Sequence, residues 1–213
     1  IWLGLVGSEM CIRDRRIAIN GFGRIGRNIV RALYQHQQSN LYSALEIVAI
    51  NDLGPAITNA HLLEFDSVHG RFNGTVTYGD EHLFIDGNSI KLLQQRDPSK
   101  LPWGELNIDL VLECTGLFTK REQSQAHIDA GAGKVIVSAP GTGLDATIVY
   151  GVNHETLTGT ERIISNASCT TNCLAPMAKI LNDAFGIEQG QMTTIHSYTN
   201  DQLLTDGMHS DLY

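Results

Sequence analysis

The chain has 213 residues, of which 42% are hydrophobic and 18% are charged, a composition that fits one large or two small globular domains. Its formal net charge of −8 argues against nucleic acid or an anionic membrane as partner, because no Lys/Arg cluster is available to neutralise phosphates. No apolar run approaches the roughly 20 residues that span a bilayer, so we expect no membrane anchor.

Four cysteines are present, at positions 11, 114, 169 and 173. They do not form the paired C-x-x-C pattern of a zinc site, and a chain of this length does not need disulfides in order to fold. We therefore expect no metal site, and a reducing, cytoplasmic location.

The first fifteen residues, Ile1 to Arg15, differ from the rest, with an apolar start and no helical or strand periodicity after it. A signal peptide does not fit, since no basic segment precedes the apolar part and no small-x-small cleavage site follows it. Ser8 to Arg15 resembles a translated sequencing-adapter remnant. We therefore interpret residues 1–15 as a non-native segment.

A strand, a glycine turn and a helix are predicted at the start of the remaining chain. The β-branched run 16–20 is followed by Gly21, Gly23 and Gly26 in the pattern G-x-G-x-x-G, then by apolar residues at helical spacing, and then by a second apolar run at 46–51. This is the β-α-β unit of parallel sheets. The glycine pattern alone is weak, but its place between strand and helix indicates a dinucleotide-binding turn.

Each residue of this turn has an expected task. Gly21 allows a tight turn, Gly23 lets the backbone approach a pyrophosphate, and Gly26 lets the helix pack on the strand. Asp52, directly after the second strand, would accept the ribose hydroxyls of NAD and repel a 2′-phosphate. The turn as a whole gives these candidate cofactor-binding residues: Gly21, Phe22, Gly23, Arg24, Ile25, Gly26 and Asp52. A glycine turn in another α/β fold stays an alternative.

Hairpins are predicted between residues 66 and 106, where the alternating runs 75–78, 82–85 and 89–93 are separated by Gly79-Asp80 and Asp86-Gly87-Asn88. The parallel pattern resumes with the apolar strand 108–114, followed by a helix near 121–130 and a strand at 134–137. Ligands of open α/β sheets bind beyond the carboxyl ends of such strands. The further cofactor candidates are therefore Thr115, Gly116, Phe118 and Ser138.

The next strands are expected at 146–150 and 162–165, and the second leads into the stretch 166–173, which reads Asn-Ala-Ser-Cys-Thr-Thr-Asn-Cys. A helix follows and ends at Gly186. Its expected core-facing residues are Leu174, Met177, Ala178, Ile180, Leu181 and Phe185. Residues 191–196 then look like a strand that delivers His196.

Cys169 is the candidate nucleophile, because a cysteine in the first turn of a helix lies among unpaired N–H groups at the positive end of the helix dipole. Lowering a thiol pKa by two or three units takes about 3–4 kcal/mol. A helix N-terminus supplies about 0.3–1 kcal/mol, and up to about 2 in favourable geometry. A second positive group is therefore needed, and His196 is the natural candidate for a thiolate–imidazolium pair and an acid/base role.

Three stretches in order carry a resemblance to a known family: residues 21–27 (GFGRIGR), 168–173 (SCTTNC) and 196–202 (HSYTNDQ). With them the chain resembles phosphorylating glyceraldehyde-3-phosphate dehydrogenase over about residues 16–213. The resemblance implies an α/β fold, with a Rossmann-type, mostly parallel dinucleotide-binding sheet at 16–168 followed by the first part of an α+β catalytic domain at 169–213. It also implies NAD as cofactor and a homotetramer when full length.

The reaction implied by this resemblance is the NAD-dependent oxidative phosphorylation of glyceraldehyde 3-phosphate to 1,3-bisphosphoglycerate. Cys169 would attack the aldehyde to form a thiohemiacetal, hydride would pass to NAD while His196 takes the hydroxyl proton, and inorganic phosphate would attack the resulting thioester. Ser168 and Thr170 match the family's site for the attacking phosphate, whereas Thr199 and Asp201 match the region of the substrate phosphate. Taken without the motif, these hydroxyls are typical of helix caps and turns.

Two other cysteines are expected to be packed and unreactive, namely Cys114 in its buried strand and Cys173 one helical turn after Cys169. The chain stops where an arginine-rich segment continues in the family, so we interpret it as a truncated fragment, expected to be weakly active or inactive. Two alternatives stay open: erythrose-4-phosphate dehydrogenase, which shares the cysteine stretch, and, for the fragment itself, an inactive nucleotide-binding module. Tyr198-Thr199 favours the triose enzyme, because the sister branch tends to lose that threonine.

Overall fold

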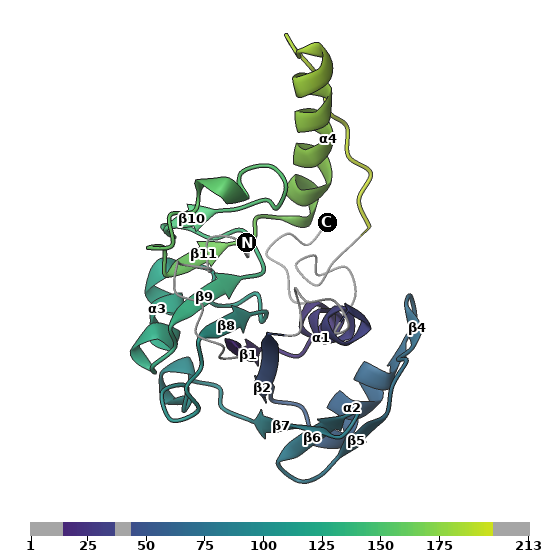
Figure 1. Cartoon of the computed structure of the whole chain (residues 1–213), viewed down its shortest axis with the longest axis vertical. Helices are drawn as coiled ribbons and strands as arrows, with labels where there is room; N and C mark the ends of the chain where they lie inside the picture. The colour runs from purple at the N-terminus through teal and green to yellow at the C-terminus, as the bar shows by residue number, and fades with distance from the viewer. Residues whose placement is uncertain (1–14, 37–43, 198–213) are drawn as a thin grey trace, which may run out of the picture.

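The computed structural model of the chain describes residues 15–36 and 44–197 (Figure 1). In this part the chain forms one nine-stranded mixed sheet, a two-stranded hairpin and four α-helices. The strands of the large sheet are β1 (Arg15–Asn20), β2 (Leu45–Asn51), β5 (Val76–Tyr78), β6 (His82–Ile85), β7 (Asn88–Leu93), β8 (Leu110–Glu113), β9 (Lys134–Val137), β10 (Ala146–Thr147) and β11 (Ile163–Ser165), and the hairpin pairs β3 (Phe65–Asp66) with β4 (Gly70–Arg71). The helices are α1 (Arg24–His36), α2 (Ala56–Glu64), α3 (Arg121–Asp129) and α4 (Cys169–Phe185), with short 3₁₀ turns η2 (Pro98–Lys100) and η3 (His154–Thr156).

The sheet has the strand order β10-β11-β9-β8-β1-β2-β7-β6-β5. Every neighbouring pair from β10 to β7 is parallel, whereas β7, β6 and β5 pair antiparallel as two consecutive hairpins. The predicted mostly parallel α/β sheet and the predicted hairpins are both confirmed. The strand expected at 146–150 is shorter, because only Ala146 and Thr147 pair with β11.

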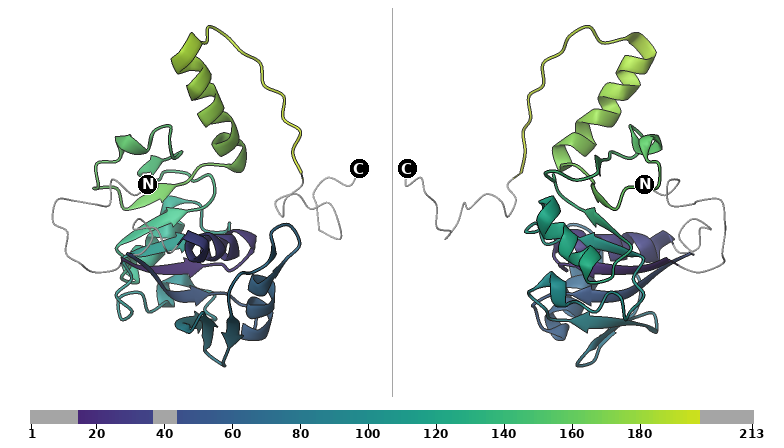
Figure 2. Two further views of the ribbon diagram at one scale, coloured as in Figure 1. Left: turned by 45° about the vertical axis from the view of Figure 1, so that its right-hand side comes forward. Right: turned by 90° about the vertical axis from the view of Figure 1, so that its left-hand side faces the viewer.

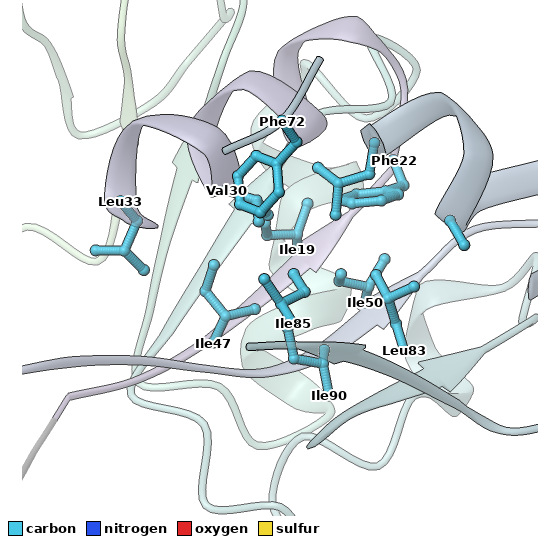
Figure 3. Packing of buried hydrophobic residues seen from close by; sticks show 12 residues of the cluster. Ile19, Phe22, Val30, Leu33, Ile47, Ile50, Phe72, Leu83, Ile85 and Ile90 are labelled. Carbon is cyan, nitrogen blue, oxygen red and sulfur yellow. The ribbon is translucent and has the colours of Figure 1, made fainter. Parts of the chain in front are cut away.

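Both faces of the parallel part of the sheet are buried, which explains why its strands read as continuous apolar runs. In β1, Ile19 belongs to one hydrophobic cluster and its neighbour Ala18 to the other, as the period-two alternation of a strand requires. Val30 and Leu33 of α1 cover the Ile19 face (Figure 3). Leu63 of α2 belongs to the same cluster. Helix α3 covers the opposite face, where Ile128 packs with Trp103 and the strands.

Helix α2 is absent from the elements that the sequence predicted. It begins after Pro55, whose fixed φ suits a helix start, and it packs beside α1. The buried Arg31 of α1 joins the two helices by donating hydrogen bonds to the carbonyl oxygens of Leu63 (2.8 Å) and Gly70 (2.9 Å). The carbonyl oxygen of Glu64 also accepts a hydrogen bond from Arg31, at 3.1 Å. The Arg31 guanidinium thus binds three carbonyl groups, two at the end of α2 and one in the β3–β4 hairpin.

Helix α4 extends away from the sheet, and the chain then returns in an extended segment (Figure 2). The prediction that one face of α4 packs against a core was wrong. The face of α4 expected to be core is exposed, with Ile180 at 68% and Phe185 at 84%. Helical periodicity shows which side chains share a face, but burial needs a second surface, and none of the described residues provides it. The helix does end at Gly186, which has φ +74°.

The strand predicted at 191–196 is also missing, because residues 191–197 are neither helix nor strand. A β-strand exists only where its N–H and C=O groups meet a neighbouring strand, and no strand in the described part pairs with this segment. The segment nevertheless brings His196 back to the start of α4, as its contact with Cys169 shows.

Candidate active site

The predicted site residues gather at one edge of the sheet. Strands β1, β2, β8, β9 and β11 are parallel, so their carboxyl ends all lie at this edge. The loops that follow them carry the following candidates in turn: Gly21 to Gly23, Asp52, Thr115 to Phe118, Ser138, and Ser168 with Cys169. Open α/β sheets bind ligands at such an edge, and here the edge also leads into α4.

The glycine turn packs closely against the loop after β8. Gly21 has φ +91°, and a Cβ atom on it would lie 2.7 Å from the backbone nitrogen of Thr115. Gly26 is equally constrained, since a Cβ there would lie 2.4 Å from the carbonyl oxygen of Gly21. Gly23 differs, because a Cβ on it would meet nothing within 4 Å. The backbone at Gly23 therefore stays open to an approaching group.

Helix α1 begins beside this open position. The first helical hydrogen bond of α1 runs from Arg27 N to Gly23 O at 3.0 Å. The N–H groups of residues 24–26 precede this first donor, and such first-turn N–H groups have no acceptor within their own helix. Arg24 and Ile25 are exposed on this first turn, Ile25 at 50%, whereas Phe22 is buried below it. An exposed helix N-terminus next to an unobstructed glycine fits a pyrophosphate.

Asp52 joins the ends of β1 and β2. One carboxylate oxygen accepts the N–H of Phe22 and the other accepts the N–H of Gly54, each at 2.8 Å. A carboxylate oxygen has two lone pairs, so one acceptor position on each oxygen is left for a ribose hydroxyl. The acceptor positions left on Asp52 thus fit a dinucleotide with free ribose hydroxyls.

The remaining cofactor candidates lie around Glu113, the last residue of β8. Thr115 is half-buried, Gly116 is exposed with φ +74°, and the ring of Phe118 lies edge-on to His127 at a centroid distance of 6.3 Å. Ser138 donates its backbone N–H to the carbonyl oxygen of Glu113 at 2.9 Å. These loops therefore face the same edge, although Phe118 turns its ring toward the interior.

The approach to α4 is held by a set of local hydrogen bonds. Ala167 has φ +58°, an unfavourable conformation for a residue with a Cβ, and it is buried. Its N–H donates to Ser165 Oγ at 2.9 Å, and the side chain of Asn172 donates to the carbonyl oxygens of Asn166 (2.7 Å) and Ser168 (2.9 Å). The sequence did not indicate Ser165 or Asn172 as functional residues. The only signal for them was that both lie near Cys169 in the chain.

Ser168 is the N-cap of α4, and its Oγ accepts the N–H of Thr171 at 3.0 Å. The capping role that its residue type suggests is therefore present in the structure. Cys169 follows as the first helical residue, and Thr170 comes directly after it in the first turn of the helix. The N–H and the hydroxyl of Thr170 both help to lower the pKa of Cys169.

The sulfur of Cys169 lies 3.2 Å from Nε2 of His196. This hydrogen bond, helped by the two donors of Thr170, lowers the pKa of Cys169 below that of an ordinary thiol. The pKa of His196 is raised, first because its Nδ1 hydrogen-bonds with the carbonyl oxygen of Ser197, and second through the Cys169 contact. Both directions favour a thiolate beside an imidazolium.

The other cysteines differ from each other. Burial raises the pKa of Cys114 to about 12, with a hydrogen bond from Ser138 opposing the effect, so this thiol is unreactive as predicted. The prediction for Cys173 was wrong, because its side chain is exposed on α4. It lies on the helix that lacks the expected covering surface.

Some predictions fall outside the described residues, namely those for residues 1–14, Thr199 and Asp201. Among the described residues, no group of three or more His, Cys, Asp or Glu side chains is arranged to hold a metal ion. A search of the same residues for a helix long and apolar enough to cross a membrane found none.

Comparison with known proteins gives two family matches. Residues 15–121 match the model of the glyceraldehyde 3-phosphate dehydrogenase NAD binding domain, and residues 168–213 match that of the C-terminal domain of the same enzyme. The chain is similar to proteins named glyceraldehyde-3-phosphate dehydrogenase from Pseudomonas aeruginosa (59% identity, 93% of this chain), Xanthobacter flavus (57%, 93%) and Clostridium pasteurianum (56%, 91%). It spans 58% of the length of the first two relatives and 56% of the third.

Proposed function

Because the chain belongs to the glyceraldehyde-3-phosphate dehydrogenase family, we propose that it carries the NAD-binding and nucleophilic parts of an enzyme that oxidises glyceraldehyde 3-phosphate to 1,3-bisphosphoglycerate. The single observation that supports this most strongly is the 3.2 Å contact between Cys169 Sγ and His196 Nε2 at the start of α4. A thiolate–imidazolium pair beside a dinucleotide-binding edge suits covalent oxidation of an aldehyde.

In the proposed reaction, the Cys169 thiolate attacks the aldehyde carbon, and the imidazolium of His196 gives its proton to the new hydroxyl. The neutral imidazole of His196 then removes that proton as the carbonyl reforms, which makes it the general base. Bound NAD supplies the acceptor for the hydride that leaves the same carbon. A thioester on Cys169 remains.

Inorganic phosphate then attacks the thioester carbon, and the thiolate of Cys169 leaves, which gives the acyl phosphate. Ser168 and Thr170 are the proposed contacts for this phosphate, supported by their position on either side of Cys169. Thr199 and Asp201 are proposed for the substrate phosphate on the resemblance alone. The N–H groups at the start of α4 can stabilise the oxyanion of each tetrahedral intermediate.

NAD is proposed to bind along the carboxyl edge of the sheet, with its pyrophosphate at Gly23 and the start of α1 and a ribose at Asp52. The unobstructed space at Gly23 and the remaining lone pairs of Asp52 support this placement. We further infer that the NAD-binding domain covers 16–168 and that the catalytic domain begins at 169. A homotetramer is proposed for the full-length protein on the resemblance alone.

A single-turnover experiment tests the proposal. The 213-residue chain is mixed with NAD and glyceraldehyde 3-phosphate, and NADH absorbance is followed, first without phosphate and then with it. We expect at most one NADH per Cys169 in the first phase and an acyl phosphate in the second. The variant C169S is expected to form no NADH while it keeps its NAD affinity, which isothermal titration calorimetry measures.

Two other results would favour the alternatives. Faster NADH formation with erythrose 4-phosphate than with glyceraldehyde 3-phosphate would assign the chain to the tetrose enzyme. NAD binding with no NADH from either aldehyde would assign this chain the role of a nucleotide-binding module.

A further inference from the structure

A buried carboxylate lies at the carboxyl edge of the sheet, outside the residues that the proposed reaction uses. Glu113, at the end of β8, is 1% exposed. Its Oε2 accepts hydrogen bonds from Asn20 Nδ2 (2.6 Å) and His127 Nε2 (3.0 Å). Its Oε1 accepts from the backbone N–H of Thr115 (2.8 Å) and from the Thr115 hydroxyl.

The protonation of this group follows from its neighbours. Trp103 Nε1 can only donate, and it donates to His127 Nδ1 at 2.9 Å, so His127 must carry its proton on Nε2 and give it to Glu113. We assign His127 as a neutral imidazole for this reason. An ionised carboxylate has about four acceptor positions, and the four donors around Glu113 fill them. A protonated Glu113 would leave one donor unsatisfied, so the geometry assigns a buried anion.

The same hydrogen bonds connect neighbouring strands at their carboxyl ends. Asn20 ends β1 and accepts the side-chain N–H of Asn51, which ends β2, at 2.7 Å. Asn51 in turn exchanges two hydrogen bonds with the backbone of Gln95, each at 2.8 Å. The loops after β1, β2, β7 and β8 are thus joined through a series of buried side chains that meets Glu113.

The loop after β8 depends most directly on this carboxylate. Thr115 donates hydrogen bonds to Glu113 from its backbone N–H and its hydroxyl, and its Oγ1 accepts the N–H of Leu117 at 3.0 Å. The backbone of Thr115 also borders Gly21, where a Cβ would lie within 2.7 Å of its nitrogen. The position of Thr115 therefore sets the gap between the loop after β8 and the glycine turn.

We propose that Glu113 is a positioning residue for the cofactor: through Thr115 it fixes the loop 115–117 against the Gly21 turn and so preorganises both loops for NAD. The proposal rests on the proposed function, because it names the two loops as NAD-binding. Glu113 itself touches neither cofactor nor substrate in this role. Preorganised loops bind more tightly because less ordering entropy is lost on binding.

A merely structural role for Glu113 makes a different prediction. A buried group that only stabilises the sheet would, on substitution, lower global stability and leave the loop and the NAD affinity as they were. The matched control is Ile85→Val, which trims a fully buried side chain in β6, on the hairpin side of the sheet away from these loops. The test variant is Glu113→Gln, which keeps the shape but turns part of the acceptor set into donors.

Two measurements on the 213-residue chain separate the roles. Amide hydrogen exchange without cofactor, followed by NMR, reports the loop itself at Thr115 and Leu117. In Glu113→Gln we expect both amides to exchange about tenfold faster relative to the β1 and β2 amides, and NAD to bind about tenfold more weakly. In Ile85→Val we expect the relative exchange rates of the two amides and the NAD affinity to stay at their wild-type values.

Thr115→Val provides a second variant in case Glu113→Gln does not fold. It retains the backbone N–H bond to Glu113 but removes the hydroxyl, so Leu117 alone should lose protection, with a smaller loss of NAD affinity. The double variant should be markedly non-additive, because both substitutions break one connected unit. Additive effects, or a Glu113→Gln profile that matches Ile85→Val, would overturn the proposal.

The two hypotheses can fail separately. If the wild-type chain does not bind NAD, the proposed function is contradicted. The amide exchange rates measured without cofactor would still decide whether Glu113 fixes the loop. Wild-type chain that binds NAD, together with unchanged exchange and affinity in Glu113→Gln, would leave the proposed function standing and remove the positioning role.

Discussion

Cys169 and His196 are 27 residues apart in the chain, yet their Sγ and Nε2 atoms lie 3.2 Å apart. The contact joins the first residue of α4 to the extended segment that follows the helix. The contact places a second positive group beside the Cys169 thiol. Such a group is needed to lower the thiol pKa, because the helix dipole contributes only about 0.3–1 kcal/mol at an exposed site. The reactivity of Cys169 therefore depends on where this segment lies.

The pair predicts a pH dependence for alkylation. The pKa of Cys169 is lowered, chiefly by the His196 hydrogen bond, so iodoacetamide should label Cys169 at pH values below those at which an ordinary thiol reacts. Cys173 is the internal control, since it is also exposed but lies one turn further along α4. Peptide mass spectrometry after timed labelling at about pH 6 to 9, a range that spans the ordinary thiol pKa, measures both rates.

Replacing His196 by Gln should move the labelling midpoint of Cys169 to higher pH, because the loss of the partner removes the largest cause of the lowered pKa. The rate of NADH formation in a single turnover should fall by about 10²–10⁴-fold, the usual contribution of general acid–base catalysis. An unchanged labelling profile in H196Q would show that the contact has no influence on the thiol.

Ser168→Ala should destabilise the chain by about 1 kcal/mol, because it removes the N-cap acceptor of the Thr171 N–H at the start of α4. Circular dichroism during urea unfolding measures the free energy of unfolding. Ser168→Thr keeps a hydroxyl at the cap and should change stability by only a few tenths of a kcal/mol. Equal losses in the two variants would argue against the capping hydrogen bond.

Gly21→Ala should lower the free energy of unfolding, whereas Gly23→Ala should chiefly lower the affinity for NAD. Gly21 has φ +91°, and a Cβ added there would lie 2.7 Å from Thr115 N, so alanine should lower the free energy of unfolding by more than about 1 kcal/mol. At Gly23 a Cβ meets nothing within 4 Å, so stability should change by less than about 0.5 kcal/mol. NAD affinity should nevertheless fall in Gly23→Ala, because the methyl group occupies the space proposed for the pyrophosphate.

Asp52→Asn should weaken NAD binding and reduce the preference for NAD over NADP. The amide keeps one acceptor oxygen for the N–H groups of Phe22 and Gly54 but loses the charge that repels a 2′-phosphate. Calorimetric titration with both cofactors measures the ratio of the two affinities. A ratio equal to that of the wild type would exclude Asp52 as a source of selectivity.

Much of the fold followed from local patterns. The apolar runs and turn residues predicted the parallel strands, the hairpins of β5 to β7 and the helices α1 and α3, because each has a periodicity of its own. Helix α2 was missed, since its short sequence after Pro55 carries no clear apolar face. The strand predicted at 191–196 was wrong, because alternation of side chains cannot supply a neighbouring strand.

For the site, the chemical groups could be read from the amino-acid sequence alone. They are a glycine turn between strand and helix, an acidic residue after the second strand, and a cysteine and a histidine in recognisable stretches. Local sequence suffices for these because turn geometry and helix starts depend on adjacent residues. Three further relationships became visible in the folded chain: Cys169 contacts His196, Gly21 borders Thr115, and the buried Glu113 accepts four hydrogen bonds. Each of these depends on contacts between segments far apart in the chain, which burial and strand order create.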